Sequence, residues 1–181
     1  MPIKAQGGAD AAGDAVTVCC CGIDPGATGA FAFFFASHPD RVAVEDLPVV
    51  AGKLDAATLA DRLRQMNPDF AVIERIHFMP KSGKATIASM MENYGAIKGV
   101  LAALQIPTHI VSTTVWKPHF RLPLGGGLTE KDKHEASRAL ALMTFPKVAD
   151  RFARKADHNR SEAALLARYG AEKLIPQQVA A

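Results

Sequence analysis

A chain of 181 residues with 49% hydrophobic and 22% charged residues has the balance of a globular protein and is long enough for one domain with a buried core. No apolar run approaches the roughly 18 residues that a membrane-spanning helix needs, so we expect a soluble protein. The formal net charge of +3 is unevenly placed, because from Lys117 onward twelve Lys and Arg outnumber seven Asp and Glu. This local excess favours a polyanionic partner such as nucleic acid.

The ends of the chain and the cysteines favour a cytoplasmic protein. Residues 1–15 are rich in Gly and Ala and lack the basic start and apolar centre of a signal peptide, so we expect a flexible tail. We expect one folded domain over residues 16–175 and a short C-terminal tail over 176–181. The cysteines at 19–21 are consecutive in a predicted strand, where neighbouring side chains point to opposite faces and cannot chelate one metal together. They are typical of small core residues in a reducing compartment.

The first predicted elements are two strands joined at a tight turn. Apolar residues 16–23 and 30–35 flank the sequence DPGATG at 24–29, whose proline and glycines are typical of a strand connection. Asp24 therefore ends a buried strand, where it belongs either to a plain hairpin turn or to a phosphate or metal site. Residues 41–46 alternate apolar and polar side chains and predict a third strand that completes an antiparallel meander.

A helix and another strand are predicted next. Residues 55–66 show the apolar face of a helix, which Asp55 or Thr58 can cap. The apolar run 70–73 does not alternate, and this is typical of a strand buried on both faces. The run ends in Glu74, which is thus a second carboxylate at the end of a strand.

The longest predicted helix spans residues 85–104. Its apolar side chains form a helical stripe, namely Ile87, Met90, Met91, Tyr94, Ile97, Val100 and Leu101. Gly95 and Gly99 would permit close approach by another helix. The stripe is explained either by packing in the core or, in part, by a subunit interface.

The last third of the chain predicts one strand and three helices. These are a strand over 107–111, a short helix that Thr113 can cap, a helix over 129–145 capped by Thr129, and a final helix that begins near 156–162. The order of elements predicts an α/β fold with a mixed sheet, an antiparallel meander followed by parallel strands, and helices on both faces.

Four carboxylates stand at the ends of these elements. Asp24 and Glu74 follow buried strands, while Asp157 and Glu162 bracket the start of the last helix. If they converge, their charge needs compensation, which divalent cations supply. We therefore expect Mg²⁺, with Mn²⁺ as a substitute, and two such ions about 4 Å apart suit phosphodiester hydrolysis. The alternative is that each acid is an independent surface or capping residue.

Three motifs carry a resemblance to a known family. They are GIDPGATG at 22–29, IERIHFMPK at 73–81 and SEAALLA at 161–167. In order and spacing they resemble RuvC-type Holliday junction resolvases, over roughly residues 18–170. The resemblance implies an RNase H-like fold, a homodimer and Mg²⁺-dependent paired nicking of four-way DNA junctions, with the first two acids of the family at Asp24 and Glu74.

The resemblance places the last acid of the family at Glu162, where the usual residue is aspartate. Its usual partner, three residues earlier, falls on Asn159, and His158 and Asp157 come just before. We favour Asp157 and His158 as metal ligands, because a neutral amide is the weakest ligand of the three. These departures resemble the divergent, often phage-borne branch of the family.

The resemblance also implies DNA contacts. The base-stacking aromatic residue of the family falls on Phe78, for which packing in the core is the alternative. Phosphate contacts fall on five lysines, namely Lys81, Lys84, Lys117, Lys131 and Lys133.

Two other functions fit parts of the sequence. A branched-DNA binding protein without catalysis would bind junctions without metal and leave them uncut. A phosphotransferase of the actin and sugar-kinase type also begins with a strand, an acid and a Gly/Thr turn like that at 24–29. That fold needs two such domains, and this chain is too short for them.

Overall fold

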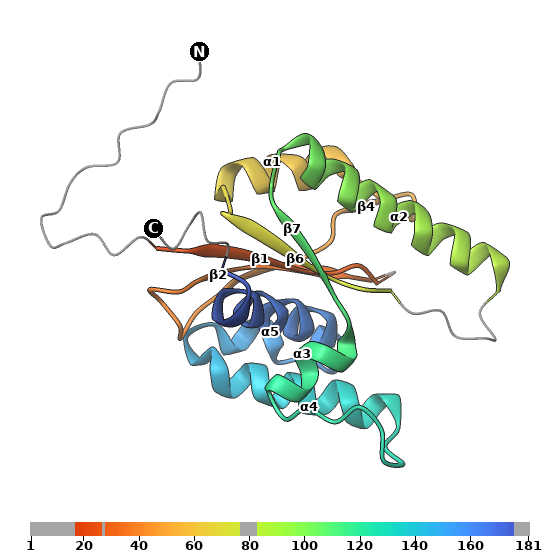
Figure 1. The fold of residues 1–181 in the computed structure, drawn as a ribbon. Coiled ribbons are helices and arrows are strands. Elements are labelled where there is room, and N and C mark those ends of the chain that lie inside the picture. The colour runs from red at the N-terminus through yellow and green to blue at the C-terminus, as the bar shows by residue number, and fades with distance from the viewer. Residues whose placement is uncertain (1–16, 27, 77–82, 176–181) are drawn as a thin grey trace, which may run out of the picture.

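The computed structural model describes residues 17–26, 28–76 and 83–175. Within them lies a five-stranded mixed sheet in the order β3-β2-β1-β6-β7 (Figure 1). Its strands are β1 (Cys19–Asp24), β2 (Ala30–Phe35), β3 (Ala43–Asp46), β6 (Phe70–Glu74) and β7 (Thr108–Val111). β1 runs antiparallel to β2 and parallel to β6, and β7 is parallel to β6. The predicted meander followed by parallel strands is therefore confirmed.

A small hairpin that the sequence patterns did not predict follows β3. β4 (Val49–Val50) pairs with β5 (Lys53–Leu54) across a turn in which Ala51 and Gly52 have positive φ angles of 50° and 78°. Two positive φ angles match the twist of a two-residue hairpin. Each strand contains only two residues, which is too short for alternation of apolar and polar residues to be recognised.

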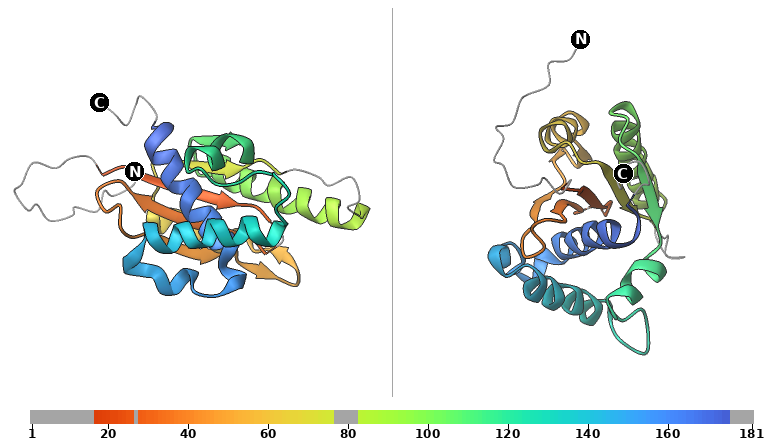
Figure 2. Two further views of the ribbon diagram at one scale, coloured as in Figure 1. Left: turned by 90° about the horizontal axis from the view of Figure 1, so that it is seen from below. Right: turned by 60° about the vertical axis from the view of Figure 1, so that its left-hand side comes forward.

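Helices cover both faces of the sheet, as expected (Figure 1, Figure 2). They are α1 (Ala56–Met66) and α2 (Lys84–Ala103) on one side, and α3 (Thr113–His119), α4 (Glu130–Thr144) and α5 (His158–Lys173) on the other. α5 packs directly on β1 and β2, while α3 and α4 pack against α5. Two short 3₁₀ helices, Pro146–Phe152 and Lys155–Asp157, connect α4 to α5.

Alternation along the strands divides the core into two parts. Cys20 and Val72 belong to the cluster that includes α5, whereas Cys21 and Ile73 belong to the cluster with α1 and α2. The cysteines are all buried and unpaired by disulfides. Burial, with a smaller effect of Asp69, raises the pKa of the Cys19 thiol to about 12, so this thiol is unreactive at neutral pH.

Gly22 of β1 and Gly170 of α5 allow the helix to pack closely against the strand. A Cβ on Gly22 would stand 2.3 Å from the amide nitrogen of Ala167 and 2.4 Å from the carbonyl oxygen of Ala163, both in α5. At Gly170 a Cβ would stand 2.5 Å from the sulfur of Cys20. This close contact sets how near the side chains of α5 come to the strand ends.

The starts of the helices agree with the predicted caps except at α3. Asp55 caps α1 and Thr129 caps α4. α3 is capped by Ser112 rather than by Thr113. Thr113 is the first helical residue. Its hydroxyl does not cap the helix but donates to the carboxylate of Glu74.

α2 buries only part of its predicted stripe. Ile97 and Leu101 lie in the core, but Met91 is 48% exposed. A Cβ on Gly95 or Gly99 would meet nothing within 4 Å, so both glycines face away from the rest of the described structure. At 20 residues α2 is long, yet neither it nor any other described helix is long and apolar enough to cross a membrane.

Candidate active site

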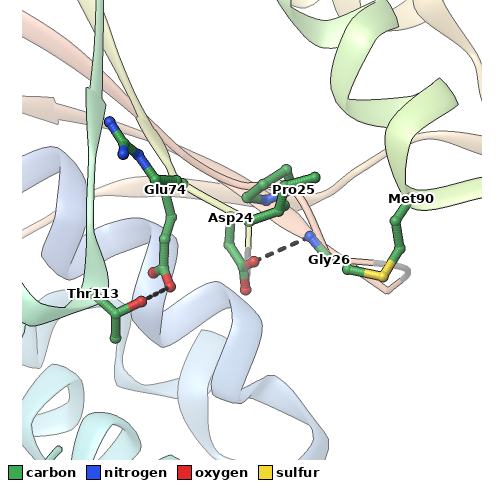
Figure 3. Close-up of a pocket in the computed structure, with 8 residues that line it drawn as sticks. Asp24, Pro25, Gly26, Glu74, Met90 and Thr113 are labelled. Atoms are coloured by element: carbon green, nitrogen blue, oxygen red, sulfur yellow. Dashed lines mark hydrogen bonds between the residues drawn. The ribbon is translucent and has the colours of Figure 1, made fainter. Parts of the chain in front are cut away.

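Two acids leave neighbouring strands side by side. β1 and β6 are parallel in a register that pairs Ile23 with Ile73, so Asp24 and Glu74 follow at the same edge of the sheet. Figure 3 shows both carboxylates at one pocket, where the Gly26 N–H donates to Asp24 Oδ1 at 3.1 Å. The turn after β1 therefore holds the first acid in place.

The pocket beside these acids has a volume of about 210 Å³. Its lining residues are Asp24, Pro25, Gly26, Glu74, Arg75, Ile76, Met90 and Thr113. Arg75 is an exposed residue of this lining, whereas the cation that acts on both carboxylates is Lys117.

Glu162 on α5 joins Asp24 and Glu74 electrostatically, and we call these three residues the acid cluster. Burial raises the pKa of Asp24 to about 8, and the negative charges of Glu162 and Glu74 add to the shift. Burial also raises the pKa of Glu74, despite the hydrogen bond that Thr113 donates. Burial is the larger cause of both shifts, and the neighbouring negative charges act in the same direction.

α3 holds Glu74 with two donors. The Thr113 hydroxyl donates to Glu74 Oε1, and the Trp116 Nε1–H donates to Oε2 at 3.0 Å. Residues three apart share one face of a helix, so a single turn of α3 fixes both oxygens. Sequence reasoning missed both donors, although their spacing of three on a helix that follows β7 was visible.

Lys117, one of the lysines expected to contact phosphates, is buried. Its ammonium donates to Glu162 Oε1 at 2.7 Å, and the Ser137 hydroxyl donates to the same oxygen at 3.0 Å. The side chains of Lys117 and Glu162 are 8% and 10% exposed. The buried carboxylate accounts for the position of the lysine, because a buried charge requires a partner.

Asp157 and Asn159, which precede Glu162, have side chains that bond residues outside the acid cluster. Asp157 is 2% exposed, and its carboxylate accepts from the backbone N–H of Arg154 at 2.9 Å and from its guanidinium at 2.8 Å. Arg160 adds an ion pair at 3.7 Å. Asp157 lines a different pocket, of about 370 Å³. The Asn159 amide donates to the Thr28 hydroxyl at 2.8 Å.

His158 forms a stacked pair with His134 of α4. Their ring centroids are 4.0 Å apart and the rings are inclined by 12°. Burial and the charge of His158 lower the pKa of His134, while Glu162 opposes this shift, so the pair lies within electrostatic reach of the acid cluster. Sequence reasoning missed His134, which lies in no motif.

The chemistry of the acid cluster fits divalent cations. Carboxylate oxygens are the ligands that Mg²⁺ and Mn²⁺ prefer, and the raised pKa of Asp24 reflects a charge that a cation would neutralise. In the part of the chain that the structure describes, no three Asp, Glu, His or Cys side chains are already grouped so as to hold a metal ion. Glu162 is instead paired with Lys117, and Glu74 with donors of α3.

The other predicted DNA contacts are distributed over several segments. Phe78 and Lys81 lie outside the described residues. Lys84 at the start of α2 and Lys131 in α4 are exposed. Lys133 forms an ion pair within α4 at 2.7 Å, with 18% of its side chain exposed.

Solved structures with a similar fold include RuvC of Thermus thermophilus. RuvC in complex with a Holliday junction substrate has a TM-score of 0.59 and 14% identity, over 85% of this chain and 93% of that chain. A second structure of Thermus thermophilus RuvC has a TM-score of 0.59 and 16% identity, over 86% of this chain and 96% of that one. Fowlpox virus resolvase in complex with substrate Holliday junction DNA has a TM-score of 0.50 and 17% identity, over 88% of this chain and 100% of that one.

No protein-family model matches the chain, and no curated protein matches it in sequence. The similarity is therefore one of fold. It confirms the RuvC-like, RNase H-like architecture that the three sequence motifs imply.

Proposed function

We propose that this protein is a metal-dependent endonuclease that resolves four-way DNA junctions by paired phosphodiester hydrolysis. The acid cluster carries the proposal, because carboxylates from β1, β6 and α5 gather at one edge of a RuvC-like sheet. The similar structures of RuvC and Fowlpox virus resolvase hold Holliday junction DNA, which supports a branched substrate here.

In this proposal Asp24, Glu74 and Glu162 hold two Mg²⁺ ions, for which Mn²⁺ can substitute. Such ions polarise a phosphoryl oxygen, make water a better nucleophile and neutralise the leaving oxygen. The chain supplies the positioning: Thr113 and Trp116 orient Glu74, and Ser137 orients Glu162. Carboxylates held in this way need little reorganisation when their ligands bind.

We assign the additional ligand near Glu162 to His158 in preference to Asp157. Two arginines already bind the carboxylate of Asp157, so a metal ion would have to compete with both of them. The imidazole of His158 is held beside α4 by its stack on His134, and a neutral imidazole is a good ligand for transition metals such as Mn²⁺.

We assign DNA contacts to exposed lysines at the starts of α2 and α4. Lys84 and Lys131 would bind phosphates, which position the strand without reading its sequence. Phe78 and Lys81, from the segment between β6 and α2, would add a base-stacking contact of about 1–3 kcal/mol and a further phosphate contact.

A cleavage assay on an end-labelled mobile four-way junction tests the function. With Mg²⁺ we expect two nicks at symmetrical positions, and with EDTA none. A linear duplex of the same sequence is the control and should remain intact. Junction binding without nicks in any divalent ion would instead support a non-catalytic binding protein.

We further propose a two-fold homodimer that uses the outward face of α2. A symmetric dimer places two copies of one site against the two equivalent strands of a junction. Gly95 and Gly99 face outward, and Met91 adds exposed apolar surface beside them.

Gly99→Glu is therefore expected to give a folded monomer that no longer makes both nicks within one binding event. The glutamate side chain has room within the subunit, so the substitution should weaken the association of two subunits without unfolding either one. Light scattering measures the mass, and a cruciform plasmid distinguishes nicked circles from linear product. Gly125→Glu, at another open position, is the control. A monomeric unmodified protein that cuts both strands efficiently would contradict the dimer.

A further inference from the structure

The buried Lys117 contacts one acid of the acid cluster and acts electrostatically on the other two. Its ammonium is 2.7 Å from Glu162 Oε1, and its charge also lowers the pKa of both Asp24 and Glu74. One cation thus interacts with all three carboxylates that are proposed to hold metal ions. Burying a lysine is costly unless its charge is compensated, and here the acids provide that compensation.

We propose that Lys117 is an internal counter-cation that competes with a divalent ion for Glu162, so that metal binding displaces the lysine from the acid cluster. The inference rests on the proposed metal-dependent function. It accounts for the lack of a ready-made three-ligand metal site among the described residues, because Glu162 is occupied by the ammonium.

The contacts of Glu162 are suited to such an exchange. Ser137 is fully buried and holds the same oxygen that Lys117 binds, so Glu162 keeps one neutral donor when the ammonium leaves. Lysine carries a compact charge on a flexible four-carbon chain, which can swing without moving the backbone of α3. The displaced ammonium remains close to the pocket and can bind an incoming phosphate.

Competition predicts the direction in which Lys117 changes the metal affinity. The lysine neutralises a carboxylate that the metal needs and repels the metal directly, so its presence weakens metal binding. By linkage, metal binding weakens the ion pair by the same factor. A lysine that only supports the fold would leave metal affinity unchanged or, on its removal, reduce it.

The test is a calorimetric titration with Mn²⁺ alone, without DNA. Lys117→Met keeps most of the length of the side chain and removes its charge, and we expect its Kd for Mn²⁺ to fall by about tenfold or more, within the usual 5–150-fold range of coupling between sites. The matched control is Lys53→Met, which breaks an exposed ion pair of 2.8 Å with Glu92 and should leave Kd unchanged. Equal or weaker binding by Lys117→Met would overturn the proposal.

A second measurement uses the unmodified protein, in case Lys117→Met does not fold. Lysine acetylation by acetic anhydride, mapped by mass spectrometry, should show Lys117 protected in EDTA and at least several-fold more reactive at saturating Mn²⁺. Lys53 should react equally in both conditions. Continued protection of Lys117 at saturating Mn²⁺ would contradict displacement.

The outcomes separate this inference from the proposed function. If the unmodified protein binds Mn²⁺ and cuts junctions but Lys117 neither weakens binding nor becomes reactive, only the competition is wrong. If neither the unmodified protein nor Lys117→Met binds Mn²⁺, the metal-dependent function and the competition are both contradicted.

Discussion

Replacing Asp24 by asparagine is expected to slow junction cleavage by about a thousandfold or more while junction binding persists. The substitution removes a charged metal ligand from the centre of the acid cluster, whereas the phosphate contacts proposed above lie on other residues. The charge stabilisation that metal ions supply is worth several kcal/mol, and about 4 kcal/mol corresponds to roughly a thousandfold in rate. Single-turnover nicking and an electrophoretic binding assay in Ca²⁺ measure the two effects separately.

The same variant should show a distinctive change in stability. In the metal-free protein the pKa of Asp24 rises from 3.8 to about 8. Between these values the unfolded chain ionises first, so this residue lowers the free energy of unfolding as the pH increases from about 4 to about 8. Asparagine cannot ionise and can still accept from Gly26, so Asp24→Asn should become increasingly more stable than the unmodified protein over that range.

Urea denaturation in EDTA at pH 5 and pH 8 measures this difference. Asp61→Asn is the control, because Asp61 is an exposed acid of α1 that pairs with Arg64 outside the acid cluster. It should change neither cleavage nor the pH dependence. Near-normal nicking by Asp24→Asn in Mg²⁺ would refute the assignment of Asp24 as a metal ligand.

Gly22→Ala is expected to destabilise the protein by about 3 kcal/mol, at the upper end of the range for overpacked cores. The added Cβ would stand 2.3 Å from a backbone nitrogen of α5, and a helix backbone cannot yield as the tip of a side chain can. α5 must therefore move away from β1. Because Glu162 lies on α5, cleavage should fall even where the protein remains folded.

Urea denaturation together with the junction assay measures both effects. Gly125→Ala is the matched control, since its Cβ would meet nothing within 4 Å, and it should cost less than 0.5 kcal/mol, the usual limit for surface changes. A stable and active Gly22→Ala protein would show that α5 does not depend on this contact for its position.

The sequence predicted the features that local patterns encode. Asp24 and Glu74 each end an apolar run, so their places at strand ends were predictable, and the parallel pairing of β1 with β6 then brings them to one edge of the sheet. The three motifs indicated the fold that the comparison with solved structures confirms. The caps of α1 and α4 were likewise predictable, because each depends on residues within one turn.

Contacts between distant segments were not predictable in the same way. Lys117 and Glu162 are far apart in the chain, and a lysine in a basic region is expected to be exposed until the fold places it beside a buried acid. The contacts of Asp157, although local, were also not predicted. Its carboxylate looked available for metal, but Arg154 lies three residues earlier and binds it within the connection before α5.

The packing of α5 on β1 also has a consequence for synthesis of the protein on the ribosome. β1, β6 and α3 have all been translated by His119, but Glu162 follows about 40 residues later, which is several seconds at about 5–20 residues per second. Until α5 emerges, one face of the central strands lacks its cover and the acid cluster lacks its third member. Completion of the fold and completion of the acid cluster therefore coincide, and a nascent chain that stops before α5 would possess neither.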